Sequence, residues 1–152
     1  MNPQTLHRDI AVQDAAEACG GMGVQRDLDL VREIMLALEQ RPTSELLERD
    51  ELTIQGRTTT EVMHHLNLLF DAGFLIAEPV RTNTGRVIYV HAQTLSWAGH
   101  EFLDTVRDPE IWKQTKAGAK KAGGFSLKVV GTIAEAIVMS HVNKLIAGGL
   151  DG

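Results

Sequence analysis

Residues 59–92, TTEVMHHLNLLFDAGFLIAEPVRTNTGRVIYVHA, decide the fold of this chain. The first half places its apolar residues on one face at helical spacing. It ends at Gly73, a residue type that readily takes the left-handed conformation with which helices stop. The second half contains two strand-like segments, 74–80 and 86–92, joined by the turn residues of 81–85. The pattern therefore predicts a helix that leads directly into a β-hairpin.

Further helices and one short strand flank this unit. Acidic residues and helical spacing predict a first helix over 27–40, and the alternation in residues 52–54 suits an edge strand. Helices are also predicted over 95–106, from residue 108 into a lysine-rich stretch, and over 126–147. The predicted fold class is α+β. It consists of a winged-helix-like domain, in which helices cover one face of a small three-stranded antiparallel sheet, plus C-terminal helices.

The length of 152 residues fits one domain of ordinary size with room for a flexible arm. Residues 1–23 end in a glycine-rich stretch that is costly to order, so we interpret them as a flexible N-terminal arm. Residues 24–107 form the predicted winged-helix-like domain. Residues 108–152 form a C-terminal helical extension, which is a candidate oligomerisation element.

Composition and charge narrow the class of protein. The net charge of −5 excludes a protein that coats nucleic acid with its whole surface, so any DNA contact requires a local basic surface. The single cysteine, Cys19, excludes an internal disulfide and a thiolate zinc cluster, and we expect a cytoplasmic protein. Glu135, His141 and Lys144 interrupt the longest apolar stretch, so we expect neither a transmembrane segment nor a membrane partner.

Three motifs carry a resemblance to a known family: RDLDLVREI at 26–34, HLNLLFDAGFL at 65–75 and LSWAGHEFLD at 95–104. In this order they resemble an uncharacterised bacterial and prophage-associated family, known as a domain of unknown function, over about residues 24–147. The resemblance implies a winged-helix-like fold and a phage or mobile-element setting, and it implies no catalytic residue. One departure is that only ELLERDEL stands before Gly56, where a standard winged helix has a second helix.

In a DNA-binding winged helix, the helix before the hairpin enters the major groove and the hairpin contacts the backbone or the minor groove. We expect His64 and Asn67 on the solvent-facing side of this helix, with Arg57 at its entrance. Because the helix contains no Lys or Arg, phosphate contacts must come from the hairpin tip and from an acid-free lysine stretch. Each candidate also suits an ordinary solvated surface. The candidate DNA-binding residues are Arg57, His64, Asn67, Arg81, Asn83, Arg86, Lys113, Lys116, Lys120 and Lys121.

The last predicted helix is apolar around more than half of its circumference, which favours self-association through this helix. The alternative is that it packs back over Trp97, Phe102 and Trp112 within one chain. We expect Trp97 to pack rather than to form part of a site with His100 and Glu101. In either case we predict that Ile133, Ile137 and Leu145 are buried. The candidate oligomerisation residues are Leu127, Val130, Ile133, Ile137 and Leu145.

Catalytic chemistry finds little support in the sequence. His64 and His65 are adjacent and point about 100° apart on a helix, so they cannot chelate one metal from one face. Glu61 and His64 have the carboxylate–histidine spacing of di-iron bundles, but the second such pair is missing. We therefore expect no enzyme activity, no catalytic residue, no metal site and no cofactor.

Two hypotheses about function remain open. The first is a non-catalytic, regulatory winged-helix protein of phage or mobile-element origin that binds double-stranded DNA. We also expect the chain to form a homo-oligomer or to bind a partner protein. The second is a winged-helix interaction adaptor or assembly subunit that binds a partner protein through its acidic first helix and apolar C-terminal helix. Residues 27–51 hold eight acids and three arginines, a net charge of −5, so the charge is polarised along the chain.

Overall fold

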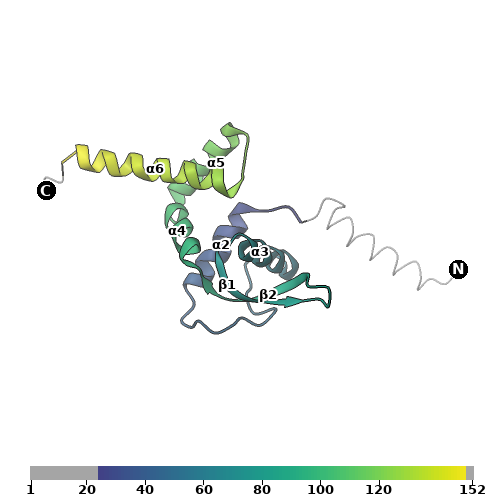
Figure 1. Ribbon diagram of the computed structural model, residues 1–152. Helices are drawn as coiled ribbons and strands as arrows, with labels where there is room; N and C mark the ends of the chain where they lie inside the picture. The colour runs from purple at the N-terminus through teal and green to yellow at the C-terminus, as the bar shows by residue number, and fades with distance from the viewer. Residues whose placement is uncertain (1–23, 150–152) are drawn as a thin grey trace.

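The computed structural model describes residues 24–149 and confirms the α+β class. The predicted flexible arm, residues 1–23, lies outside the described residues. Figure 1 shows the hairpin and α3 at one end of the body and α5 and α6 at the other. The described elements are α2 (Leu28–Glu39), α3 (Thr59–Asp71), β1 (Leu75–Arg81), β2 (Val87–Leu95), α4 (Trp97–Val106), α5 (Pro109–Ala122) and α6 (Leu127–Ala147).

Polar side chains set the point at which each helix begins. Asp27 caps α2 by accepting from the N–H groups of Asp29 and Leu30, and Asp108 caps α5 in the same way. Thr58 and Glu61 form a reciprocal capping box at the start of α3. These caps satisfy amide donors that a helix leaves without an internal partner, which explains why the helix starts were predictable from the sequence. Serines cap the two other helices, at Ser96 for α4 and Ser126 for α6.

One continuous core joins the hairpin region to the C-terminal helices. Leu30, Ile34 and Met35 of α2 are fully buried at its centre. The buried cluster continues into Trp112 of α5 and Val130 of α6. The C-terminal extension predicted over residues 108–152 therefore completes the same core, and at least its described part packs as a portion of one domain.

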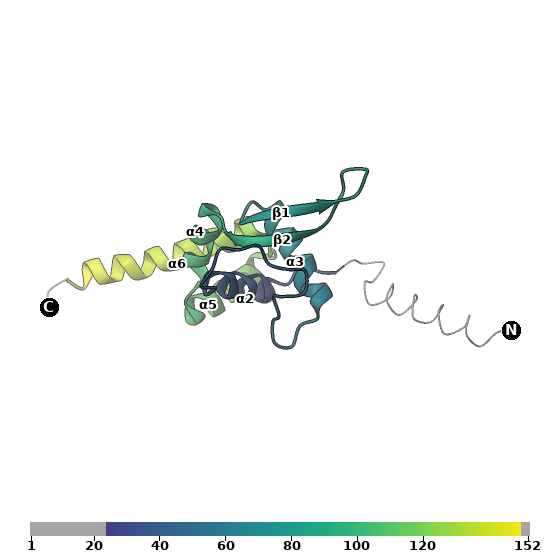
Figure 2. The ribbon, with the colours of Figure 1, turned by 90° about the horizontal axis from the view of Figure 1, so that it is seen from below.

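β1 and β2 form a two-stranded antiparallel sheet that projects past α3 as a hairpin (Figure 2). The pairing runs from Leu75 opposite Leu95 to Arg81 opposite Val87, with two irregularities in register. At the base of the hairpin, α4 comes so close to the sheet that a Cβ on Gly99 would lie 2.2 Å from the carbonyl oxygen of Phe74. Glycine is therefore required where α4 joins the sheet.

The predicted third strand at residues 52–54 is wrong, because the described segment 41–58 contains no strand. Its alternation does reflect burial, since Leu52 and Ile54 are half-buried against the core. Two groups from the segment after α2 bind carbonyl oxygens of β2. The Leu47 N–H donates to Ala92 O (2.8 Å), and the Arg41 guanidinium donates to Gln93 O (3.0 Å). These bonds satisfy carbonyl groups that a third strand would have needed.

Two predictions about burial are also wrong. Trp97, expected to pack, is 82% exposed in the first turn of α4. Leu145, expected to be buried, is 69% exposed because α6 extends beyond the body (Figure 1). Both side chains are apolar, but no element in the described part of this chain covers them.

Candidate nucleic-acid interface

Arg57, a predicted DNA contact, lies in an ion pair at the start of α2. Its guanidinium approaches the Asp27 carboxylate at 2.6 Å. Beside this pair, the buried imidazole of His65 accepts from the Asp27 N–H at 2.8 Å and contacts Glu61 O at 2.7 Å through its other ring nitrogen. Because the Glu61 carbonyl only accepts, His65 carries its proton on Nδ1 and is neutral. Arg57 and His65 thus join α3 to α2.

Lys116, another predicted DNA contact, is held at the same place. Its ammonium lies 2.9 Å from Oδ1 of Asp29, and this oxygen also accepts from the Trp112 indole N–H at 2.7 Å. The ammonium also lies over the Trp112 ring. We call the set Asp27, Asp29, Arg57, His65, Trp112 and Lys116 the helix junction, because it ties α2, α3 and α5 together. Its basic side chains are neutralised within the chain.

The pKa values follow from this geometry. Burial disfavours the charged form of Asp27, but hydrogen bonds from the Leu30 N–H and Arg57 outweigh it and lower the pKa of Asp27. Burial acts in the same sense on Asp29, where hydrogen bonds from Lys116 and Trp112 lower the pKa. Burial lowers the pKa of His65. The helix junction therefore favours two carboxylates and one neutral imidazole.

The side of α3 that we expected to face solvent and contact DNA bases is only partly exposed. The prediction that Asn67 faces solvent is wrong: its side-chain amide donates to Ile88 O of β2 at 3.1 Å, and its Oδ1 is buried. The amide therefore ties α3 to the hairpin. His64 is partly exposed, and its ring lies edge-on to His65. Spacing alone could not reveal the contact of Asn67, because it depends on where β2 passes over the helix.

The hairpin tip carries the most available of the predicted basic residues. Arg81, Asn83 and Arg86 are exposed. Arg81 donates to Gly85 O at 2.9 Å, which holds it within the turn, and Gly85 takes a positive φ of 85°. Among the described residues, no ion pair involves Arg81 or Arg86. Their charges are therefore directed to solvent rather than neutralised by a carboxylate.

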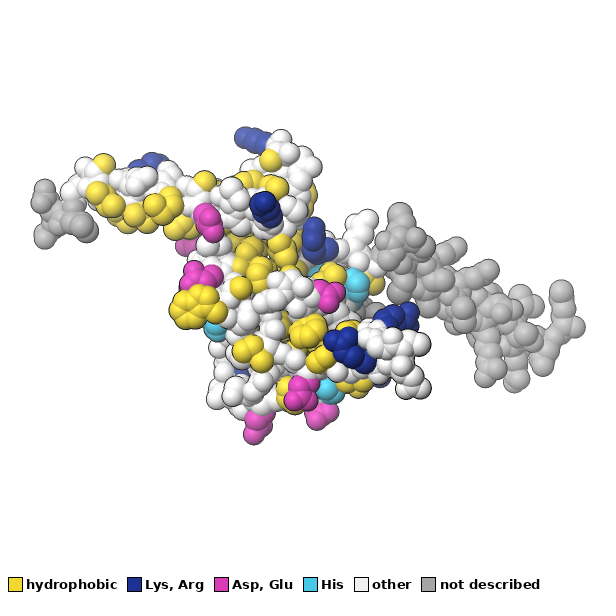
Figure 3. All heavy atoms as spheres, in the orientation of Figure 1, with side chains coloured by type: hydrophobic (Ala, Val, Ile, Leu, Met, Phe, Trp, Pro, Cys, Tyr) yellow, Lys and Arg dark blue, Asp and Glu magenta, His cyan; other side chains and the backbone are white. Residues whose placement is uncertain are grey.

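The lysines of α5 divide into two groups. Lys116 belongs to the helix junction, whereas Lys113, Lys120 and Lys121 are exposed. In Figure 3 the Lys and Arg side chains lie along the top and right side of the molecule, from α5 down to the hairpin. Most acidic side chains in that view lie at the left and lower edges. The basic residues thus form a discontinuous strip on one side of the body.

The acidic first helix is less available than predicted. Asp27 and Asp29 are engaged in the helix junction, and Glu39 is bound by Arg107, whose hydrogen bonds lower the pKa of Glu39. Four exposed acids lie instead in the irregular segment that follows α2: Glu45, Glu48, Asp50 and Glu51. The exposed acidic surface therefore belongs mainly to this segment.

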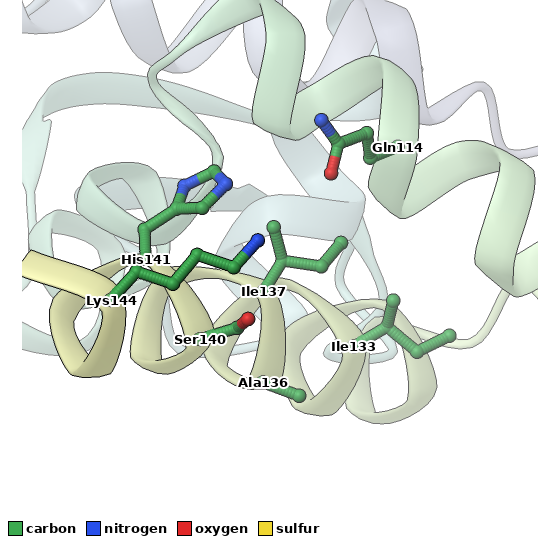
Figure 4. A pocket seen from close by; sticks show the side chains of 7 residues that line it. All are labelled: Gln114, Ile133, Ala136, Ile137, Ser140, His141 and Lys144. Atoms are coloured by element: carbon green, nitrogen blue, oxygen red, sulfur yellow. The ribbon is translucent and has the colours of Figure 1, made fainter. Parts of the chain in front are cut away.

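The predicted oligomerisation residues lie mostly within the chain's own core. Val130 is fully buried, and Leu127 and Ile133 are partly buried against the core. Ile133 and Ile137 also line an open groove of about 330 Å³ between α5 and α6. Figure 4 shows Gln114 of α5 on one side of this groove and Lys144 on the other. Of the predicted set, Leu145 is the one that is largely exposed.

Two further features of the described residues concern metal binding and a membrane span. No group of three or more His, Cys, Asp or Glu side chains there is placed to hold a metal ion. By length and composition alone, the 21-residue helix α6 would suffice to cross a membrane, which is weak support for a membrane span. Polar residues on its outer turns include Ser140, His141, Asn143 and Lys144.

Comparison with known proteins places the chain in a family. A protein-family model described as "Hypothetical protein (DUF2513)" matches residues 25–126. An uncharacterized protein of Haemophilus influenzae (strain Rd) is 30% identical over 119 residues, which cover 76% of this chain and 96% of that protein. No solved structure matches. These matches confirm the expected membership of an uncharacterised family: the chain belongs to the DUF2513 family.

Proposed function

We propose that this protein is a non-catalytic, winged-helix-like regulator that binds the backbone of double-stranded DNA. The observation that carries the proposal is the projecting hairpin, whose Arg81 and Arg86 are exposed and have no carboxylate partner among the described residues. A projecting hairpin with two such arginines has the chemistry to contact two phosphates or to enter a minor groove.

The remaining exposed basic residues support the same surface. Lys113, Lys120 and Lys121 extend the basic strip along α5. Thr59 and Thr60 at the start of α3 are exposed, and His64 in the next turn is partly exposed, so these side chains remain available for contacts with bases or phosphates. Because Arg57, Asn67 and Lys116 are engaged within the protein, we expect backbone contacts to dominate and sequence discrimination to be weak.

The test is the salt dependence of duplex DNA binding, measured by fluorescence anisotropy with the full chain. Each phosphate contact that is lost reduces the slope of log K against log salt by about one. We expect the double variant Arg81→Ala, Arg86→Ala to reduce this slope by about two. Removing Lys120 and Lys121 together should reduce it further.

Arg49 supplies a matched control. It carries the same charge but lies over the Tyr89 ring, in the segment with the exposed acids. Arg49→Ala should leave the salt slope unchanged. Absence of binding to random duplex DNA at low salt, or equal losses for Arg49→Ala and the hairpin variant, would overturn the proposed function.

A further inference from the structure

The outer half of α6, residues 139–147, is an apolar helical surface that the described chain does not cover. Leu145 is 69% exposed, Ile146 63% and Met139 55%. The inner half differs because Val130 and Ala134 are fully buried. In Figures 1 and 2 the outer half extends away from the body with no other helix beside it. Packing of an apolar face supplies much of the stability of a helix in a protein, and the outer half of α6 has no such packing among the described residues.

The apolar side chains of the outer half lie on one side of the helix. Val142 and Leu145, together with Val138 immediately before the outer half, follow the four-then-three spacing of a helix–helix seam, and Met139 and Ile146 broaden it. Figure 4 shows Lys144 and His141 pointing toward the α5 side. In Figure 3 apolar side chains form a row along the lower side of the projecting helix. This one-sided pattern fits packing against another helix better than a lipid-facing span, which requires apolar groups all round.

A second uncovered apolar group lies on α4, below the projecting helix. Trp97 is 82% exposed, the largest exposed fraction among the large hydrophobic side chains that the structure describes. The outer half of α6 and the body form an open corner with α4 on its inner side (Figure 1). Trp97 is the first residue of α4, and tryptophan is one of the residue types enriched at the centre of protein interfaces.

The area of the uncovered surface favours a second copy of the chain as its occupant. The projecting helix and the open corner belong to the same chain, which is the arrangement that a two-fold dimer needs, because each copy can then place its outer half in the corner of the other. The exposed parts of Trp97, Met139, Val142, Leu145 and Ile146 offer roughly 500 Å² on each copy, or roughly 1,000 Å² in total, the area at which specific interfaces begin.

We propose that two copies of this chain form a two-fold dimer in which the outer halves of α6 pack antiparallel and each reaches Trp97 of the other copy. This surface lies away from the hairpin, which projects from the opposite end of the body (Figure 1). The dimer therefore does not depend on the proposed DNA contacts. It differs from the predicted oligomerisation set, because Leu127, Val130 and Ile133 serve the chain's own core.

The mass of the full chain in solution tests the dimer. Light scattering coupled to size exclusion should give twice the chain mass of 16.7 kDa. Val142→Asp places a charge in the centre of the seam and should give a monomer with unchanged circular dichroism. Asn143→Asp adds the same charge at the next, exposed position on the polar side, and should remain a dimer. A wild-type monomer at submillimolar concentration, or equal behaviour of the two variants, would overturn the proposal.

Trp97 gives an independent readout. Dilution of the wild-type protein should shift its tryptophan emission to longer wavelength as Trp97 returns to water, and Trp97→Phe should abolish the shift, since Trp112 stays buried. Trp97→Ala should weaken the dimer at least tenfold. In a parallel sedimentation assay with phosphatidylcholine vesicles, the dimer should stay in the supernatant. A monomer that pellets with the vesicles would show a lipid surface in place of the second copy.

Discussion

The helix junction and the hairpin tip hold similar basic residues in opposite circumstances. At the junction, Arg57 and Lys116 face Asp27 and Asp29 at distances of 2.6 and 2.9 Å. At the hairpin tip, the arginines are exposed and have no carboxylate partner among the described residues. The sequence alone lists all of them as candidate DNA contacts.

The difference shows that the nearest carboxylate in space decides what a basic side chain does. Asp29 and Lys116 are 87 positions apart in the sequence, so helical spacing within α5 could not reveal their contact. Changes at the junction should therefore alter stability and leave the intrinsic DNA contacts intact. Changes at the hairpin should do the reverse.

The largest effect is expected for His65→Ala. This change removes a fully buried ring and leaves both the Asp27 N–H and the Glu61 carbonyl without their side-chain partner. Loss of packing and of two hydrogen bonds should lower the free energy of unfolding by about 3 kcal/mol, measured by urea denaturation. The neighbouring and partly exposed His64 is the matched control, and His64→Ala should cost less than about 0.5 kcal/mol. Equal losses would mean that the junction has no special role in stability.

A smaller loss is expected for Asp29→Ala. The carboxylate oxygen accepts from both Trp112 and Lys116 but is partly exposed, so its contribution is reduced by solvent. We expect a loss of about 1 to 2 kcal/mol. Asp29→Asn keeps an acceptor for the indole and should retain part of this stability. Asp71→Ala, at an exposed position of α3, serves as the control, and a loss there as large as that for Asp29→Ala would contradict the assignment.

A gradual effect is expected from pH. The pKa of His65 lies below its ordinary value of 6.5 in the folded chain, so the unfolded chain binds more protons between these two values. Stability should be full above about pH 6.5 and fall as the pH drops toward the folded pKa. Asp27 and Asp29 have lowered pKa values and contribute to acid sensitivity only at a pH near or below their ordinary 3.8. Urea denaturation of wild type and His65→Asn as a function of pH measures this difference, and identical profiles would exclude His65 as its source.

The smallest effect on stability is expected at the hairpin tip. Arg81→Ala with Arg86→Ala removes exposed side chains, and the single hydrogen bond from Arg81 to Gly85 lies within the turn. The free energy of unfolding should change by less than about 0.5 kcal/mol. Thermal denaturation checks this value on the same sample used for DNA binding. A large loss of stability would mean that the arginines support the fold, and the contrast with the junction would then fail.

Local signals predicted much of this fold, because caps and turns act over a few residues. Asp27, Thr58 and Gly73 mark the ends of helices in the sequence and in the structure. The prediction of a third strand was wrong because alternation of apolar residues indicates burial, but it does not show that a sheet edge is free to pair with the segment. The predictions for Asn67 and Trp97 were wrong because both depend on elements distant in the sequence. Asn67 is bound by β2, which passes over it, whereas no described element covers Trp97.

The two edges of the small sheet have a consequence for solubility. Exposed strand edges pair readily with strands of other molecules and start aggregation. On the β2 side, Arg41, Leu47 and Asn67 already bind carbonyl groups of the strand. On the β1 side, Pro79 has no N–H to offer to an incoming strand. The hairpin can therefore project into solvent without presenting a regular template for amyloid-like growth.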